Sequence, residues 1–173
     1  IYINYNSKSD TRVGYFKVEI QEALSPYFFD NQKKLLCISS AMHLVKILTA
    51  DSQKNTSIFN LLENFYKLLK DDNWIKKYIF WELELFKLVG YDLEFKNLVN
   101  KKINGDQLQY ISKSTIEKKL VPNFLIDKTQ DTEDITTLLN GLKLVGDYLD
   151  KTILKPNNLT HPIIRLQFIN TLK

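Results

Sequence analysis

Residues 72–95, DNWIKKYIFWELELFKLVGYDLEF, carry the most apolar helical pattern of the chain and decide its fold. Asp72 or Asn73 can cap a helix at the start of this stretch. Gly90 is placed to end it, because glycine adopts the left-handed conformation without strain. Apolar residues recur between these points at helical spacing and cover most of the circumference: Trp74, Tyr78, Ile79, Trp81, Leu83, Leu85, Phe86 and Leu88. Such a helix belongs in the middle of a bundle.

Apolar periodicity predicts two helices before this one, at about 30–49 and 57–70. In the first of them, the expected core face includes Leu35, Ile38 and Met42, followed by Val45 and either Ile47 or Leu48. Cys37 lies on the same helix in an apolar run and is expected to be a small core residue rather than a nucleophile.

Two more helices are predicted toward the C-terminus. One starts near Asp131 or Thr132, either of which can cap it, and the last starts at Thr160 and Pro162. The earlier of the two contains Gly141 and Gly146. Each glycine costs about 1 kcal/mol relative to alanine inside a helix, so we expect close helix packing there.

Two segments have β character. Residues 1–20 contain two runs in which apolar and polar residues alternate, which predicts a hairpin. Residues 93–127 have no sustained helical period and predict a small protruding unit of strands and loops. The predicted fold class is therefore mainly α: a helical bundle over 21–173, preceded by the β-hairpin of 1–20.

Composition limits the function without fixing it. The 24 basic and 20 acidic residues give a net charge of +4, which permits contact with nucleic acid but does not demand it. A single cysteine excludes an internal disulfide and fits a reducing cytoplasm. No charge-free apolar run has the roughly 18 residues that a membrane span needs. The chain begins with Ile1 rather than Met, so we expect that the start of the protein is missing.

The sequence offers no recognisable catalytic arrangement. His43 and His161 lack a Ser, Cys or Asp at a catalytic spacing, and the five glycines are too scattered to form a phosphate loop. Glu82 and Glu84 point in different directions on a helix, and a structural role is expected for Glu82. The residues by themselves therefore predict neither a catalytic site nor a cofactor.

Several strings, in the same order and spacing, resemble those of the bacterial recombination mediator family RecO. WELELFKLVGYDLEF (81–95) resembles "FELxLLxxLGYxxxL", and GYFKVEI (14–20) resembles the "LGxFxVEL" join between an OB barrel and a helical domain. DQLQYIS (106–112) is similar to "xLxYVSP" of alphaproteobacterial members, and YLDKTIL (148–154) to "FLExHL". Arg165 falls where the family has the Arg of "LKSR".

The resemblance implies a fold and a function. Residues 1–20 would be the closing hairpin of an OB barrel, and 93–127 would be a protrusion. The family is expected to bind single- and double-stranded DNA in the bacterial cytoplasm, at the nucleoid, and to anneal complementary strands. With RecR, it would load RecA onto DNA covered by single-strand-binding protein. The resemblance implies no enzyme activity. A helical protein-interaction or regulatory domain without DNA contact is the alternative, and an uncharacterised hydrolase is a more distant one.

Basic residues are the candidate nucleic-acid contacts. They lie in the hairpin, at the start of the first helix and near the C-terminus: Lys8, Arg12, Lys17, Lys33, Lys34 and Arg165. Tyr2, Tyr5 and Tyr15 could stack on bases or fill a barrel core. Some family members use an Arg pair to dock the acidic tail of single-strand-binding protein, and this chain has Ile79 and Phe80 there. Lys76 and Lys77 are the candidate substitutes.

The resemblance also raises the question of zinc. Many RecO proteins bind a structural zinc through four cysteines in the protrusion. In this chain, Leu98 and Lys101 stand about where the family has its first pair of cysteines. The region 112–120, where the second pair would lie, has no cysteine either. Structural zinc needs about four Cys or His ligands, so we expect no metal.

Overall fold

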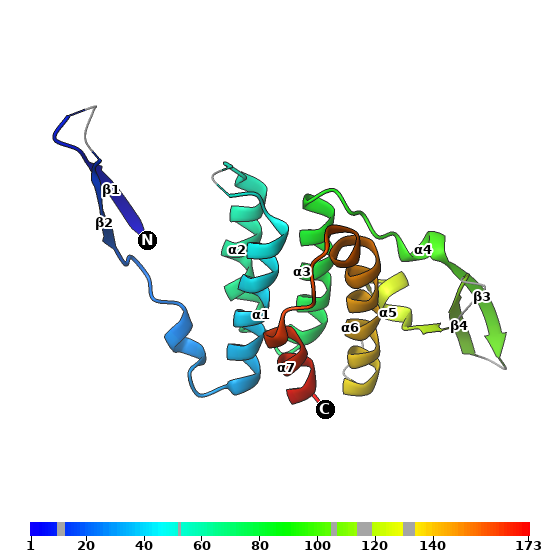
Figure 1. The fold of residues 1–173 in the computed structure, drawn as a ribbon. Helices are drawn as coiled ribbons and strands as arrows, with labels where there is room; N and C mark the ends of the chain where they lie inside the picture. The colour runs from blue at the N-terminus through cyan, green and yellow to red at the C-terminus, as the bar shows by residue number, and fades with distance from the viewer. Residues whose placement is uncertain (10–12, 52, 105–106, 114–118, 130–133) are drawn as a thin grey trace.

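The structure is a computed structural model that describes residues 1–9, 13–51, 53–104, 107–113, 119–129 and 134–173 (Figure 1). Among these residues, no helix is long and apolar enough to cross a membrane. The helices and helical turns, in chain order, are η1 (Ser25–Phe28), α1 (Gln32–Leu48), α2 (Thr56–Leu68), α3 (Trp74–Leu88), α4 (Phe95–Leu98), α5 (Asn123–Ile126), α6 (Ile135–Leu149), the π-helical η2 (Asp150–Leu154), η3 (Lys155–Asn157) and α7 (Ile163–Thr171).

Helix α3 lies at the centre of the bundle, as predicted from its apolar circumference. It contacts α1, α2 and α6, and Figure 1 shows it between α2 and α6. Tyr78, Leu85 and Phe86 have no exposed surface. The indole N–H of Trp81 donates to the carbonyl oxygen of Leu61 on α2 at 3.0 Å. Burial over most of its circumference explains why this one segment determines the arrangement of the others.

Helix α3 also ends as predicted. Gly90 adopts a φ of 96°, and its N–H donates to the carbonyl oxygen of Lys87 at 3.0 Å. The N–H of Tyr91 donates to the carbonyl oxygen of Phe86 at 2.8 Å. This pair of hydrogen bonds is a Schellman motif, which needs a left-handed residue and therefore favours glycine.

The predicted core face of α1 is confirmed in part. Ile38 is buried, and Leu35, Met42 and Val45 are partly buried and pack against the core. The fully buried residues of the helix include Ala41 and Leu44, which were not predicted. Apolar periodicity gives little weight to small residues, so the full burial of Ala41 was not predicted. The prediction for Cys37 is confirmed, and burial, followed by the charge of a nearby carboxylate, raises the pKa of its thiol.

Helix α6 begins later than predicted, at Ile135, with Asp134 as its cap. The carboxylate of Asp134 accepts from the N–H groups of Thr136 and Thr137 at 3.3 and 2.8 Å. The expected caps, Asp131 and Thr132, lie outside the described residues.

The predicted close packing at the two glycines of α6 is confirmed. A Cβ at Gly141 would lie 2.5 Å from Cζ of Phe124, and one at Gly146 would lie 2.7 Å from Nη1 of Arg165. Both distances are too short for any real Cβ contact. The absence of a side chain therefore lets α5 and α7 approach α6.

The β segments extend from the bundle at two sites (Figure 1). At the N-terminus, β1 (Tyr2–Asn6) and β2 (Tyr15–Glu19) pair antiparallel, with Tyr5 opposite Phe16. In the protrusion, β3 (Val99–Asn104), β4 (Gln107–Ser112) and β5 (Leu120–Val121) form an antiparallel sheet in that order. The predicted class, mainly α with a hairpin and a small strand unit, is therefore confirmed.

Candidate nucleic-acid interface

Two of the lysines predicted to contact nucleic acid lie in the described part of the hairpin. Lys8 is exposed. Lys17 is exposed as well and pairs with Glu19 at 3.1 Å. Solvent-exposed pairs of this kind contribute little free energy, so Lys17 can exchange its partner for a phosphate. Arg12 lies outside the described residues.

Basic and aromatic side chains meet where η1 leads into α1. Lys33 is exposed on the first turn of α1. Nζ of Lys34 lies 5.9 Å from the ring centroids of both Phe28 and Trp74, and Nζ of Lys70 lies 5.1 Å from that of Tyr27. The two α1 lysines were predicted from the sequence, but these aromatic contacts were not. The signal was the run of three aromatics at 27–29, immediately before them.

The prediction that Arg165 contacts nucleic acid needs correction. Its side chain is 1% exposed and lies in the centre of the bundle. Nε donates to Oε1 of Glu82 at 3.0 Å, and Nη2 donates to Oε2 at 2.7 Å. Nη2 also reaches the carbonyl oxygen of Leu142 at 3.3 Å. With its donors taken inside the fold, Arg165 cannot meet a ligand at the surface.

The ion pair of Arg165 with Glu82 joins three helices. Glu82 belongs to α3, Arg165 to α7, and the Leu142 carbonyl to α6. Burial opposes the charge of the guanidinium, but the adjacent carboxylate of Glu82 outweighs it, so the pKa of Arg165 rises above its ordinary value. A buried, bidentate pair of this kind sets how the three helices meet, which confirms the structural role expected for Glu82.

The two lysines predicted to dock a partner differ in exposure. Lys76 is 8% exposed and lies among the buried residues of α3. Lys77 is exposed, and its Nζ contacts Oδ2 of Asp71 at 2.5 Å. Lys77 is therefore the more accessible of the two, although an acidic partner would have to compete with Asp71.

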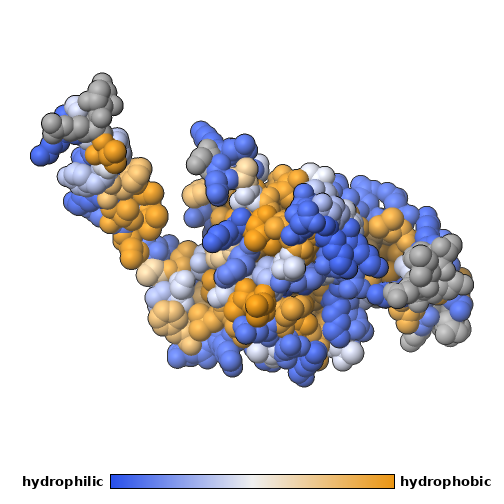
Figure 2. Space-filling view, in the orientation of Figure 1, coloured by the Kyte–Doolittle hydropathy of each residue, from blue (hydrophilic) through white to orange (hydrophobic). Residues whose placement is uncertain are grey.

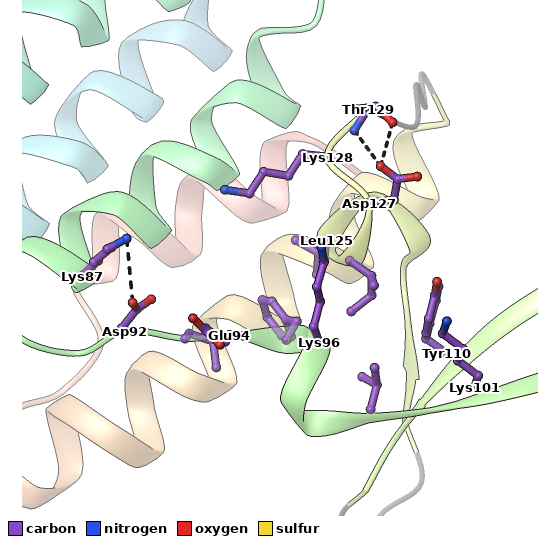
Figure 3. A pocket seen from close by; sticks show the side chains of 14 residues that line it. Lys87, Asp92, Glu94, Lys96, Lys101, Tyr110, Leu125, Asp127, Lys128 and Thr129 are labelled. Carbon is purple, nitrogen blue, oxygen red and sulfur yellow. Dashed lines mark hydrogen bonds and ion pairs between the residues drawn. The ribbon is translucent and has the colours of Figure 1, made fainter.

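A cavity of about 970 Å³ lies between the C-terminal end of α3, the protrusion and α5 (Figure 3). Its wall mixes charges of both signs with the aromatic residues Phe95 and Tyr110, and Figure 3 shows Lys101 beside Tyr110. Lys87 contacts Asp92 at 3.8 Å across one side. Asp127 accepts from both the N–H and the hydroxyl of Thr129, and these bonds lower the pKa of its carboxyl. This cavity was not predictable from local sequence patterns, because its wall combines residues from α3, the protrusion and α5.

No group of three or more His, Cys, Asp or Glu residues in the described ranges could hold a metal ion. The expected absence of zinc concerns the whole chain, part of which lies outside those ranges, and stays a prediction.

The fold defines a class of protein: a helical bundle around one buried helix, with β extensions and basic side chains at its edge. Residues 31–121 match the family model described as "Recombination protein O C terminal". The DNA repair protein RecO of Rhodospirillum centenum is 22% identical over 92% of this chain and 68% of its own length. The DNA repair protein RecO of a Wolbachia (subsp. Drosophila simulans) is 23% identical over 95% of this chain and 76% of its own length. No solved structure matches.

The family match covers more than half of the chain and includes α1, α2 and α3 entirely. The chain therefore belongs to the RecO family of DNA repair proteins.

Proposed function

We propose that this chain is a non-enzymatic recombination mediator that binds DNA and anneals complementary strands. The observation that carries the proposal is the family match over residues 31–121. Binding would rest on charge neutralisation by lysines at the edge of the bundle and on stacking by aromatic residues. Annealing driven in this way consumes no nucleotide.

The proposal extends to the place and the partners of the reaction. In the bacterial cytoplasm, at the nucleoid, the protein would act with RecR to load RecA onto DNA covered by single-strand-binding protein. Lys77, exposed on the first turn of α3, would attract the acidic tail of single-strand-binding protein. The Lys77→Ala variant should then bind a peptide of that tail more weakly than the Lys87→Ala control, which removes an exposed lysine from the other end of α3.

The hairpin is proposed to be part of an OB barrel, with residues 21–173 as the helical domain. Ile3, Tyr5, Phe16 and Val18 share one face of the hairpin and are all at least half exposed. Figure 2 shows apolar surface gathered over this region. Two strands alone cannot cover such a face, and further strands of a barrel would.

Salt titration of DNA binding tests the main proposal. The affinity for a labelled oligo-dT should fall as salt is added. Each neutralised phosphate of single-stranded DNA contributes about −0.7 to the slope of log affinity against log salt concentration. Replacing Lys8, Lys17 and Lys33 by alanine should flatten the slope by about 2. Lys155→Ala is the matched control, since Lys155 is exposed and pairs with Asp150 at 2.6 Å away from these sites.

The alternative is a helical protein-interaction or regulatory domain without DNA contact. If the protein neither binds oligo-dT at low salt nor accelerates the annealing of complementary strands, the mediator proposal is wrong and this alternative stands.

A further inference from the structure

The short turn before α1 presents two aromatic rings to solvent and anchors them with a third. Tyr27 and Phe29 are 66% and 64% exposed, whereas Phe28 between them is 5% exposed. The ring of Phe28 stacks on Tyr66 of α2, with centroids 6.5 Å apart. The Phe28 carbonyl oxygen accepts from the N–H of Asn31, which caps α1. The exposed rings are therefore held by the core, although they do not belong to it.

Positive charge lies beside one of these rings and on the adjoining turn of α1. Nζ of Lys70 lies 5.1 Å from the centroid of Tyr27, and Lys34 reaches over the anchoring Phe28. Lys33 is exposed on the adjoining turn of α1. The acidic side chains nearby in sequence are Asp30, Asp71 and Asp72, of which Asp71 is engaged by Lys77.

We propose that Tyr27 and Phe29 form a stacking platform for the bases of single-stranded DNA, with Lys33, Lys34 and Lys70 along its phosphates. The proposal rests on the proposed function and locates one contact at the η1–α1 junction. A base can stack on any aromatic face regardless of its sequence. Lys70 beside Tyr27 places a cation close enough to neutralise a phosphate attached to a stacked nucleotide.

Charge distinguishes this occupant from an apolar protein partner. Exposed aromatic residues can mark any interaction site, but an apolar partner helix or strand would have to bury the neighbouring lysines without compensation. A single strand supplies both a flat apolar base and a negative phosphate in every nucleotide. This combination matches two exposed rings flanked by lysines.

The test replaces both rings by leucine, Tyr27→Leu with Phe29→Leu, so that the apolar character remains and the aromatic faces are lost. The affinity for oligo-dT should fall on the order of tenfold or more. Phe59→Leu is the matched control, because Phe59 is 60% exposed and lies near the start of α2, at the other end of the bundle from η1. The control should bind as the unmodified protein does, and all melting temperatures should agree.

An abasic oligonucleotide of equal length provides the second probe, since it keeps the phosphates and lacks the bases. The unmodified protein should bind oligo-dT more tightly than the abasic strand, and the double leucine variant should lose that preference while keeping its salt slope. Equal oligo-dT affinity in variant and parent would overturn the platform and leave the mediator proposal standing. An equal loss of affinity for oligo-dT and for the abasic strand would also overturn it. If the unmodified protein binds neither strand, both proposals are wrong.

Discussion

Helix α3 and the β1–β2 hairpin are both rich in apolar residues, yet they meet opposite environments. Tyr78, Ile79 and Phe86 in α3 are fully buried, whereas Tyr5 and Phe16 in the hairpin are 54% and 66% exposed. The helix has neighbours on several sides, while a two-stranded ribbon cannot cover its own face. Stability therefore concentrates around α3, and surfaces available for contact concentrate at the edges.

The largest effect should come from breaking the buried ion pair. Glu82→Ala leaves the Arg165 guanidinium buried without its counter-charge, which should lower the free energy of unfolding by about 3–5 kcal/mol. Glu84→Ala, an exposed carboxylate two residues later on α3, should change it by no more than about 0.5 kcal/mol. Denaturant titration measures both. Similar values for the two variants would mean that the centre of α3 does not hold the fold.

A smaller effect is expected where α5 meets α6. Gly141→Ala places a Cβ against the ring of Phe124 and should cost about 1–3 kcal/mol, despite the higher helix propensity of alanine. The control is Gly141→Ala combined with Phe124→Leu, which removes the ring that the Cβ meets. In thermal melts, the alanine should cost less in the Phe124→Leu background than in the parent. A stabilised single variant would contradict the close packing.

The next effect depends on pH. Hydrogen bonds from Thr137, followed by one from Thr136, lower the pKa of Asp134, so its carboxylate stabilises α6 above the pKa that it has in the unfolded chain. That contribution is lost as the pH falls through the lower, folded value. Asp134→Asn keeps the cap and removes the titration. Melting temperatures from pH 7 to pH 2 should therefore fall more steeply in the parent, and parallel curves would exclude this role.

The smallest effect should come from the hairpin. Val18→Thr changes a side chain that is 53% exposed, so the free energy of unfolding should shift by no more than about 0.5 kcal/mol. The same type of change in α3, Ile79→Thr, buries a hydroxyl in the core and should cost several times more. Comparable losses in the two variants would show that the hairpin belongs to the same cooperative core.

The sequence predicted what local patterns determine. The apolar circumference of α3, the glycine at its end and the small packing residues of α6 were all predictable, because each depends on nearby residues. Arg165 was misassigned because its partner, Glu82, is 83 residues away, and nothing local distinguishes a buried arginine from an exposed one. The exposure of Tyr27 and Phe29 escaped prediction for a related reason. Tertiary contacts decide which of three adjacent aromatics enters the core.

Hydrogen–deuterium exchange with and without oligo-dT is the most direct test of the central claim. The claim is that the edges of the bundle bind DNA while the central helix α3 holds the fold together. Amides of α3 should exchange slowest in both states, since their opening requires disruption of the core. Added oligo-dT should protect η1, the first turn of α1 and the hairpin, and leave α3 and α7 unchanged. Protection centred on α3 and α7 around Arg165, with none at η1, would contradict the account.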